Sequence, residues 1–212
     1  VASGSADCTV VLWHFSQHLG LLVGDYNMPG EEPSPRAILT GHDSEISAIC
    51  VSAEHGIVLS GSTDGALLMH STQGDLLRSI ICSNGNGTDT LAPINNILFS
   101  RDCYIAAFIG NDSLATFSTN GQLLKQRGYK CAEKILCAIL SRDGEFVVFG
   151  TDNGRISILR LFTLQLLYTF AQCDSPIRSL ALSTNQRLIF GGLDSGAIVV
   201  FNVDFNRWHH YG

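Results

Sequence analysis

Lysine is scarce in this sequence: among its 212 residues, Lys125, Lys130 and Lys134 are the only lysines, and the formal net charge is −6. A surface that follows the phosphates of nucleic acid needs clustered positive charge, so we do not expect nucleic acid as a partner. Charged residues of both signs make up only 15% of the chain, whereas apolar residues make up 45%. That composition supports a large core and excludes an intrinsically disordered chain.

Cysteine pairs and membrane segments are also lacking. The seven cysteines form no Cys-x-x-Cys pair, and several lie in apolar runs such as "AICV" and "ILCAIL". This pattern is typical of buried free thiols in a reducing compartment, so we expect a cytoplasmic protein; a peripheral location on intracellular membranes stays open. No apolar run has the length of a membrane span, and no secretory signal is recognisable.

What the sequence does contain is an internal repeat of short apolar runs. The second unit reads "EISAICVS", "GIVLSGS", "TDG" and "ALLMHS", and the other units follow the same order of runs and turns. The position of Trp13 recurs as His70, Ser118, Leu159 and Phe201, at spacings of 57, 48, 41 and 42 residues. Four short strands per unit, at a period of about 40–45 residues, are typical of a β-propeller blade.

The repeat predicts an all-β fold, a WD40 β-propeller of which about four and a half blades are present. The predicted blade boundaries are 1–40, 41–81, 93–128, 134–171 and 176–212. The first unit has only its later half, and Val1 opens within a strand-like run, so we expect the upstream blades to be missing from this sequence. The excess length of the first spacing falls in Ser16–Pro35, which we interpret as a surface loop.

The string "SGSTDGALLMH" places a serine, an aspartate and a histidine within a few residues of one another, as a hydrolase would need. The first unit keeps the serine and the aspartate, but it has Trp13 where the second unit has His70. An indole donates a hydrogen bond and cannot act as a base, so this position is one of packing and not of catalysis. We therefore interpret the grouping as structural.

The string "LTGHDSEISAICVS" together with "VLSGSTDGALLMHS" resembles a WD40 repeat, with Gly41 and His42 as its Gly-His element. The resemblance implies a hydrogen-bond network in which a loop histidine meets the turn aspartate, while a serine and a tryptophan extend the network. The residues that this implies are His42, Asp64 and Ser60 in the second unit, and Ser3, Asp7 and Trp13 in the first.

Other strings suggest chemistry only weakly. "GNDSL" would make Ser113 a nucleophile, but no histidine stands at a suggestive spacing. "WHHY" offers His209 and His210 as metal ligands, yet neighbouring residues of a strand face opposite ways. We expect no catalytic residue, no metal and no cofactor. A candidate interaction surface remains in the basic segment and the aromatic end of the chain: Lys125, Arg127, Lys130, Lys134, Trp208 and His209.

Longer strings carry a closer resemblance. "GSADCTVVLWHF", "PRAILTGHDSEI", "GDLLRSI" and above all "IVVFNVDFNRWHH" resemble the C-terminal propeller of the neurobeachin and lipopolysaccharide-responsive beige-like anchor family of BEACH–WD40 proteins. The resemblance covers nearly the whole chain. It implies a non-enzymatic scaffold that binds other proteins, preceded in the same chain by PH-like and BEACH domains, in a large protein of vesicle trafficking and membrane-protein sorting.

Two other functions stay open on the residues alone. One is a free-standing cytosolic WD40 adaptor, and the other is a peripheral membrane-binding module that uses the basic segment between Lys125 and Lys134. A hydrolase built on a propeller would need acids or histidines converging from the inner strands. The inner runs "AICVS", "ILFS", "AILS" and "LALS" offer almost none.

Overall fold

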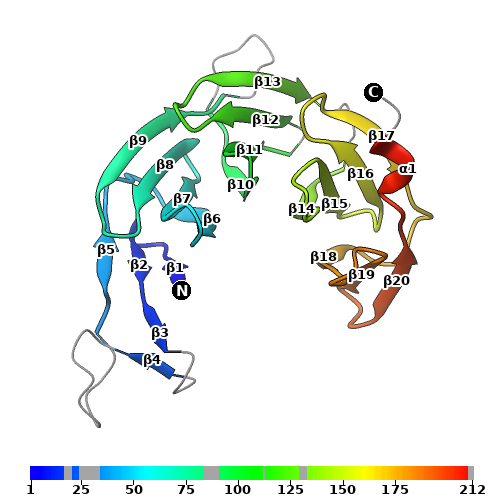
Figure 1. Cartoon of the computed structure of the whole chain (residues 1–212), viewed down its shortest axis with the longest axis horizontal. Helices are drawn as coiled ribbons and strands as arrows, with labels where there is room; N and C mark the ends of the chain where they lie inside the picture. Colours follow the sequence, from blue (N-terminus) through cyan, green and yellow to red (C-terminus); the bar gives the residue numbers. More distant parts are fainter. Residues whose placement is uncertain (17–20, 24–33, 84–90, 112, 129–132, 210–212) are drawn as a thin grey trace. The chain divides into compact units, whose positions relative to one another are not determined.

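The computed structural model describes residues 1–16, 21–23, 34–83, 91–111, 113–128 and 133–209. These residues form antiparallel strands in six sheets, together with one short helix (Figure 1). The predicted all-β fold and the repeat of blade-like sheets are confirmed. The chain divides into two compact units, one made of residues 1–83 and 91–97 and the other of residues 98–209, among those described. Each unit is treated by itself below.

The first unit holds a three-stranded sheet, a hairpin and a four-stranded sheet. The three-stranded sheet has the order β1 (Ala2–Gly4), β2 (Val10–Leu12), β5 (Ala37–Leu39), and the hairpin pairs β3 (His14–Ser16) with β4 (Leu21–Val23). The four-stranded sheet runs β6 (Ile46–Ser52), β7 (Ile57–Ser62), β8 (Ala66–Ser71), β9 (Leu76–Ile81). The expected surface loop Ser16–Pro35 therefore begins with a hairpin; its residues 17–20 and 24–33 lie outside the described residues.

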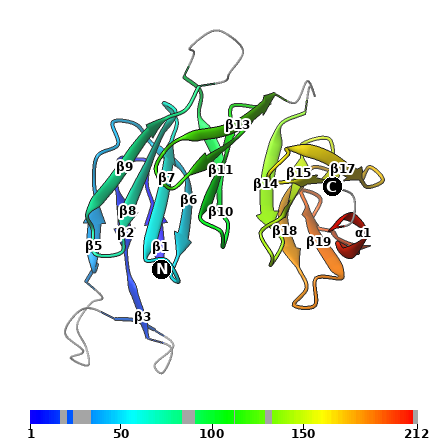
Figure 2. The same cartoon turned by 45° about the horizontal axis from the view of Figure 1, so that its top comes forward.

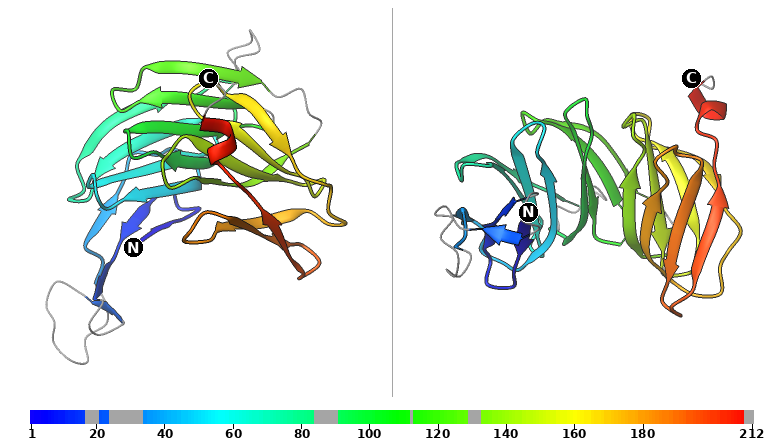
Figure 3. Two further views of the ribbon diagram at one scale, coloured as in Figure 1. Left: turned by 45° about the vertical axis from the view of Figure 1, so that its right-hand side comes forward. Right: turned by 60° about the horizontal axis from the view of Figure 1, so that its bottom comes forward.

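The second unit follows the same meander. Its first sheet begins with β10 (Ile94–Phe99), whose start belongs to the first unit, and continues with β11 (Tyr104–Ile109), β12 (Ser113–Ser118), β13 (Leu123–Gly128). The next sheet contains β14 (Ile135–Leu140), β15 (Phe146–Thr151), β16 (Ile156–Arg160), β17 (Gln165–Thr169). The last contains β18 (Ile177–Leu182), β19 (Leu188–Leu193), β20 (Ile198–Asn202). The helix α1 (Asn206–His209) follows β20 (Figure 3).

Burial rises toward the middle of each four-stranded sheet. Every residue of β15 is buried, as are four of the five residues of β16, whereas β17 is largely exposed. The same contrast separates β7 and β8 from β9. Strands covered on both faces carry continuous apolar runs, which is why "FVVFG" and "ISIL" lack polar alternation. The core of each unit is therefore built by the middle strands.

A glycine on the second strand of one sheet faces an isoleucine that opens the first strand of the next. A Cβ atom added to Gly150 would lie 2.6 Å from Cγ2 of Ile177, closer than real Cβ atoms approach other atoms. Within the second unit, β14 and β15 accordingly pack on β18, and Figure 2 shows β14 beside β18. The same contact recurs twice in the first unit, from Gly61 to Ile94 at 2.7 Å and from Gly4 to Ile46 at 2.6 Å.

The strand register corrects one member of the predicted repeat. His70, Leu159 and Phe201 each pair with the second residue of the second strand of their sheet. In β12 the residue with that pairing is Phe117, which is 4% exposed, and not the expected Ser118. A shift of one residue moves a side chain to the other face of a strand, so an apolar residue, and not a hydroxyl, occupies this packing position.

We predict that Gly150→Ala destabilises the domain by roughly 1–3 kcal/mol, because the added methyl group would overlap Ile177. Urea denaturation would measure the change. The exposed turn residue Thr184 offers a control, since Thr184→Ala should leave the midpoint nearly unchanged. Combining Gly150→Ala with Ile177→Ala should cost less than the sum of the two single changes. Strict additivity would contradict the contact.

Candidate functional site

His42, in the connection before β6, forms a hydrogen bond with Ser60 of β7. Its Nε2 atom lies 2.8 Å from the Ser60 Oγ, and the two side chains are 9% and 0% exposed. The other ring nitrogen, Nδ1, is buried and has no hydrogen-bond partner among the described residues. The expected hydrogen bond from His42 to Asp64 is therefore absent from the described part of the chain, whereas His42 and Ser60 do meet.

Asp64 is held instead by its own turn. Its Oδ1 accepts hydrogen bonds from the Ser62 hydroxyl and, at 3.0 Å, from the amide of Ala66. The hydrogen bond from Ser62 is the main cause that holds the pKa of Asp64 below its usual range, and burial opposes it. A hydrogen bond from the side chain of Ser44, in the connection before β6, lowers the pKa of Asp64 further. The carboxylate is thus held by its own turn and by Ser44, and not by the histidine.

A serine at 2.8 Å from a histidine has the geometry of a nucleophile and its base. Ser60, however, is fully buried, so a substrate could not reach its hydroxyl without unfolding of the sheet. His70, the other histidine of this sheet, is 2% exposed, and its Nε2 atom lies 3.2 Å from the carbonyl oxygen of Thr40. The serine, aspartate and histidine of "SGSTDGALLMH" are thus structural, and each of the three side chains has a different partner.

Burial lowers the pKa of both buried histidines, and the proximity of His70 lowers that of His42 further. A carboxylate partly offsets the effect on His42, since Asp64 raises its pKa. Both rings are therefore neutral in the folded protein at pH 7.

In the first sheet, Ser3 and Trp13 meet as the resemblance implied. The indole Nε1–H of Trp13 donates to the Ser3 hydroxyl at 3.0 Å. Asp7 takes its hydrogen bonds from Thr9, at 2.6 Å from the hydroxyl and 2.9 Å from the amide, and the hydroxyl contact is the main cause of its lowered pKa. The hydrogen bonds of Asp7 thus come from residues of its own turn.

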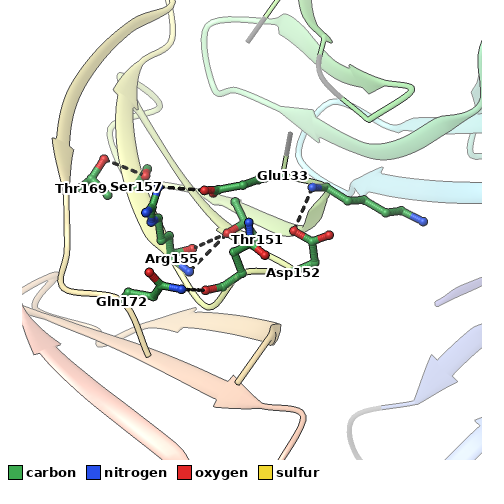
Figure 4. A network of polar contacts seen from close by, with 9 residues as sticks. Glu133, Thr151, Asp152, Arg155, Ser157, Thr169 and Gln172 are labelled. Carbon is green, nitrogen blue, oxygen red and sulfur yellow. Dashed lines mark hydrogen bonds and ion pairs between the residues drawn. The ribbon is translucent and has the colours of Figure 1, made fainter. Parts of the chain in front are cut away.

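In the sheet β14–β17, other side chains join the connection before the first strand to the turn after the second strand (Figure 4). The Arg155 guanidinium, after β15, forms an ion pair of 2.8 Å with Glu133, before β14. The amide of Lys134 donates to Asp152 at 3.0 Å. In the sheet β18–β20, Arg178 and Asp194 make an ion pair of 2.7 Å. In these two sheets, an ion pair therefore ties the turn after the second strand to the start of the first strand or to the connection before it.

The aromatic end of the chain packs inward. The string "WHHY" begins in the helical turn α1 and not in the strand we expected. The Trp208 ring lies against Phe146, Phe205 and Tyr168, with centroid distances of 6.2, 6.1 and 6.2 Å. Only part of this ring is left for a partner. The backbone of His209 ends α1, and the position of its side chain, like all of His210, lies outside the described residues.

The basic segment is not one loop. Lys125 and Arg127 are exposed residues of β13, and the Arg127 guanidinium donates to the carbonyl oxygen of Leu164 at 2.8 Å. Lys134 is exposed just before β14, and Lys130 lies outside the described residues. Lys125 and Arg127 belong to a strand because the run "LLKQRG" continues the meander as the fourth strand of its sheet.

The structure has two surface hollows that were not predicted from the sequence. One of about 560 Å³ is lined by Asn185, Arg187, Asn202 and Asp204, among others, and one of about 370 Å³ by Arg142, Ser183 and Gln186, among others. Both lie at turns of the form Ser-x-Asp or Ser-x-Asn, a recurrence that the sequence does show. Ser113, the other suggested nucleophile, is buried and accepts a hydrogen bond of 3.1 Å from the Gln126 amide.

The described residues carry neither a metal centre nor a membrane-spanning helix. They contain no group of three or more histidine, cysteine, aspartate or glutamate side chains placed to hold a metal ion. Nor do they form a helix with the length and apolar character that crossing a membrane requires.

Comparison with known proteins agrees with this geometry. The family model of the neurobeachin beta propeller domain matches residues 1–210. The chain belongs to the neurobeachin β-propeller family. Neurobeachin homologues of Caenorhabditis briggsae and Caenorhabditis elegans are 50% and 49% identical to it over 210 residues, which is 99% of this chain in each case. BEACH domain-containing protein B of Arabidopsis thaliana is 28% identical over 219 residues, covering 96% of this chain.

The propeller makes up a small part of these relatives, since the chain spans 8% of the length of each of the three. Among solved structures, the computationally designed Ika8 protein has a TM-score of 0.69 and 23% sequence identity, with 95% of this chain and 55% of that chain covered. This likeness bears on the fold alone. The predicted family and the predicted propeller fold are both confirmed.

We predict that Asp64→Ala destabilises the propeller by roughly 1–3 kcal/mol, because the Ser62 hydroxyl and the Ala66 amide lose their acceptor. Asp64→Asn keeps an acceptor oxygen and should cost less. Thermal melting of the variants measures both effects. An Asp64→Ala melting curve that coincides with the wild type would refute the structural role.

Folding stability should fall as the pH drops through about 6.5, the usual pKa of an unfolded histidine, because the folded state keeps His42 and His70 neutral. Leu159 fills the position of His70 in the sheet β14–β17, so His70→Leu is a natural substitution. Its urea midpoint should depend less on pH between about 7.5 and 5 than that of the wild type. The exposed His14, replaced by leucine, is the control. Equal pH dependence of the His70→Leu variant and the wild type would count against a buried neutral His70.

Proposed function

We propose that this propeller is a non-enzymatic platform for protein–protein interaction within a large BEACH-type protein. The observation that carries the proposal is the distribution of side chains between the inner and outer strands. The polar side chains of His42, Ser60 and Asp64 are engaged in structural hydrogen bonds. The outer strands, in contrast, expose large apolar residues to solvent. These exposed residues include Leu76, Leu77, Ile81, Leu123, Leu124, Leu166 and Tyr168.

Large apolar side chains in the exposed fourth strands are suited to partner binding, because they gain contact area when water is displaced. The fourth strands also carry unpaired backbone groups on their outer side, which an extended peptide segment of a partner can use. A catalytic function would need convergent groups open to substrate, and Ser60 and Ser113 are both buried.

The context of the whole protein belongs to the same proposal. A relative whose name includes the BEACH domain supports a BEACH domain in the whole protein. By the resemblance described above, we propose that PH-like and BEACH domains precede the propeller and that the whole protein acts in vesicle trafficking and membrane-protein sorting. The six cysteines in the described part of the chain are free, which supports a cytoplasmic location, with peripheral association to intracellular membranes.

The test uses the full-length protein, cross-linked to its neighbours in cells. Replacing Leu76, Leu123 and Leu166 by serine should remove a subset of the cross-linked proteins, while the melting transition stays close to that of the wild type. Replacement of Asn120, an exposed residue of the turn between β12 and β13, by serine is the control. If removal of the entire propeller left the set of cross-linked proteins unchanged, the scaffold proposal would be wrong.

A peripheral membrane-binding module is the alternative, supported by the exposed Lys125 and Lys134. Flotation of the full-length protein with anionic vesicles separates the two functions. On the scaffold proposal, the double charge reversal Lys125→Glu with Lys134→Glu leaves flotation unchanged. Loss of flotation in this variant would favour the membrane-binding module.

A further inference from the structure

A small hollow of the second unit lies beside the fourth strand β13, and we call it the β13 hollow. Its volume is about 90 Å³. Pockets that hold a whole small-molecule ligand measure about 300–1,000 Å³, so a hollow of this size takes a single side chain. The lining residues come from β11, β12, β13 and the segment after β16: Tyr104, Thr116, Leu124, Lys125, Leu161 and Phe162.

The walls of the β13 hollow are aromatic and aliphatic. The rings of Tyr104 and Phe162 meet edge to face, with their centroids 5.0 Å apart. Phe162 and Leu124 are 45% and 47% exposed, whereas Leu161 is buried in the core of the unit. An apolar side chain that enters the hollow therefore displaces water from apolar surface, which favours its binding.

An extra residue in β13 brings an apolar side chain and a cation to the same hollow. In the pairing of β12 with β13, Thr116 lies opposite Lys125. The next residue, Phe117, lies opposite Leu123, so the pairing skips Leu124. Neighbouring residues of a regular strand face opposite ways, whereas a bulge re-aims a side chain. Leu124 and Lys125 accordingly both line the hollow.

Lys125 is the one charged residue among the described residues that line the β13 hollow. Its side chain is exposed, and within the described part of the chain its ammonium group forms no ion pair. Asp102 and Glu145 stand close to lining residues, along the chain or through a backbone hydrogen bond, but neither of them lines the hollow. Because an ammonium group attracts a carboxylate, the hollow favours a ligand that carries a carboxylate beside an apolar group.

We propose that the β13 hollow binds a leucine or phenylalanine side chain of an extended segment of a partner protein. A glutamate or aspartate two residues along the segment pairs with Lys125. Residues two positions apart lie on the same side of an extended chain, about 7 Å from each other. This partner chemistry rests on the proposed function of the propeller as an interaction platform.

An anionic membrane fits the β13 hollow less well. Segments that bind anionic lipid carry clusters of about four to eight lysines and arginines, whereas the lining of the hollow contains Lys125 alone. A flat bilayer surface also leaves the hollow unfilled.

The test measures binding of a fluorescent peptide to the full-length protein. The peptide has about twelve residues, with a leucine at its centre, a glutamate two positions later and serine or threonine elsewhere. Two reference peptides replace the leucine by alanine or the glutamate by glutamine. We expect both references to bind more weakly than the leucine peptide, the alanine peptide by about tenfold or more.

Variants of the lining test the two contacts separately. Phe162→Ala removes a wall of the hollow, so it should weaken binding of the leucine peptide by about tenfold and abolish the preference for leucine over alanine. Lys125→Gln should weaken binding by about threefold, because an exposed ion pair contributes little. This variant should also bind the glutamate and glutamine peptides equally. Melting curves of both variants check that the propeller is folded.

A matched control exists at the same position of another sheet. The pairing of β8 with β9 skips Leu77, and the next residue, Arg78, is exposed. Arg78→Gln removes the same charge from the equivalent strand position and should bind every peptide as the wild type does. Equal weakening by Lys125→Gln and Arg78→Gln would show a general effect of charge and overturn the pairing with Lys125.

Three further results would overturn the β13 hollow as a docking site. An unchanged preference for leucine in a folded Phe162→Ala variant would place the apolar side chain elsewhere. Equal binding of the three peptides, or no binding of any of them, would exclude the partner chemistry. Loss of flotation with phosphatidylserine vesicles by Lys125→Gln, with unchanged peptide binding, would assign Lys125 to lipid.

The proposed function and the β13 hollow fail in distinguishable ways. If propeller removal eliminates cross-linked proteins while Lys125→Gln and Phe162→Ala retain them all and bind the peptides normally, the platform stands and the β13 hollow is wrong. If propeller removal changes nothing, the platform itself is wrong.

Discussion

The contact between a glycine and the isoleucine of the following sheet is the constraint on which the rest of the structure depends. Because Gly150 has no Cβ atom, Ile177 can approach the backbone of β15, and strands β14 and β15 of one sheet pack against β18 of the next. Because strand side chains alternate with a period of two, fixing the register at the glycine also fixes which residues face the layer. The burial of His70 and of Leu159 at one repeat position follows from that register.

Polar side-chain pairs have the same structural role in different sheets. Each ties the connection before a first strand to the second strand or to the turn that follows it, by His42 and Ser60, by Glu133 and Arg155, or by another pair. Such variety is expected when geometry matters more than chemistry, since any satisfied polar pair can hold the connection. On the proposed function, partner binding falls to what the sheets leave exposed, above all the apolar residues of the fourth strands.

Much of the fold could be predicted from the sequence, because the strand lengths, the turn residues and the period of the repeat can all be identified in the order of residues along the chain. The partners of His42 and Asp64 could not, since they depend on turn geometry finer than the spacing of residues. The choice of Ser118 in place of Phe117 was wrong because the pairing of β11 with β12 defines this position, and the sequence alone does not give strand register to one residue. The hairpin at His14–Ser16 pairs too few residues to show alternation.

Native-state hydrogen exchange of the full-length protein tests the central claim most directly. If the contact between Gly150 and Ile177 joins the two neighbouring sheets into one cooperative unfolding unit, the amides of β15 and β18 should exchange with the same free energy of opening and the same dependence on denaturant. The exposed strand β17 should exchange at a lower free energy. Exchange of β18 to β20 at a much lower free energy than β15, as an independent unit, would contradict the account.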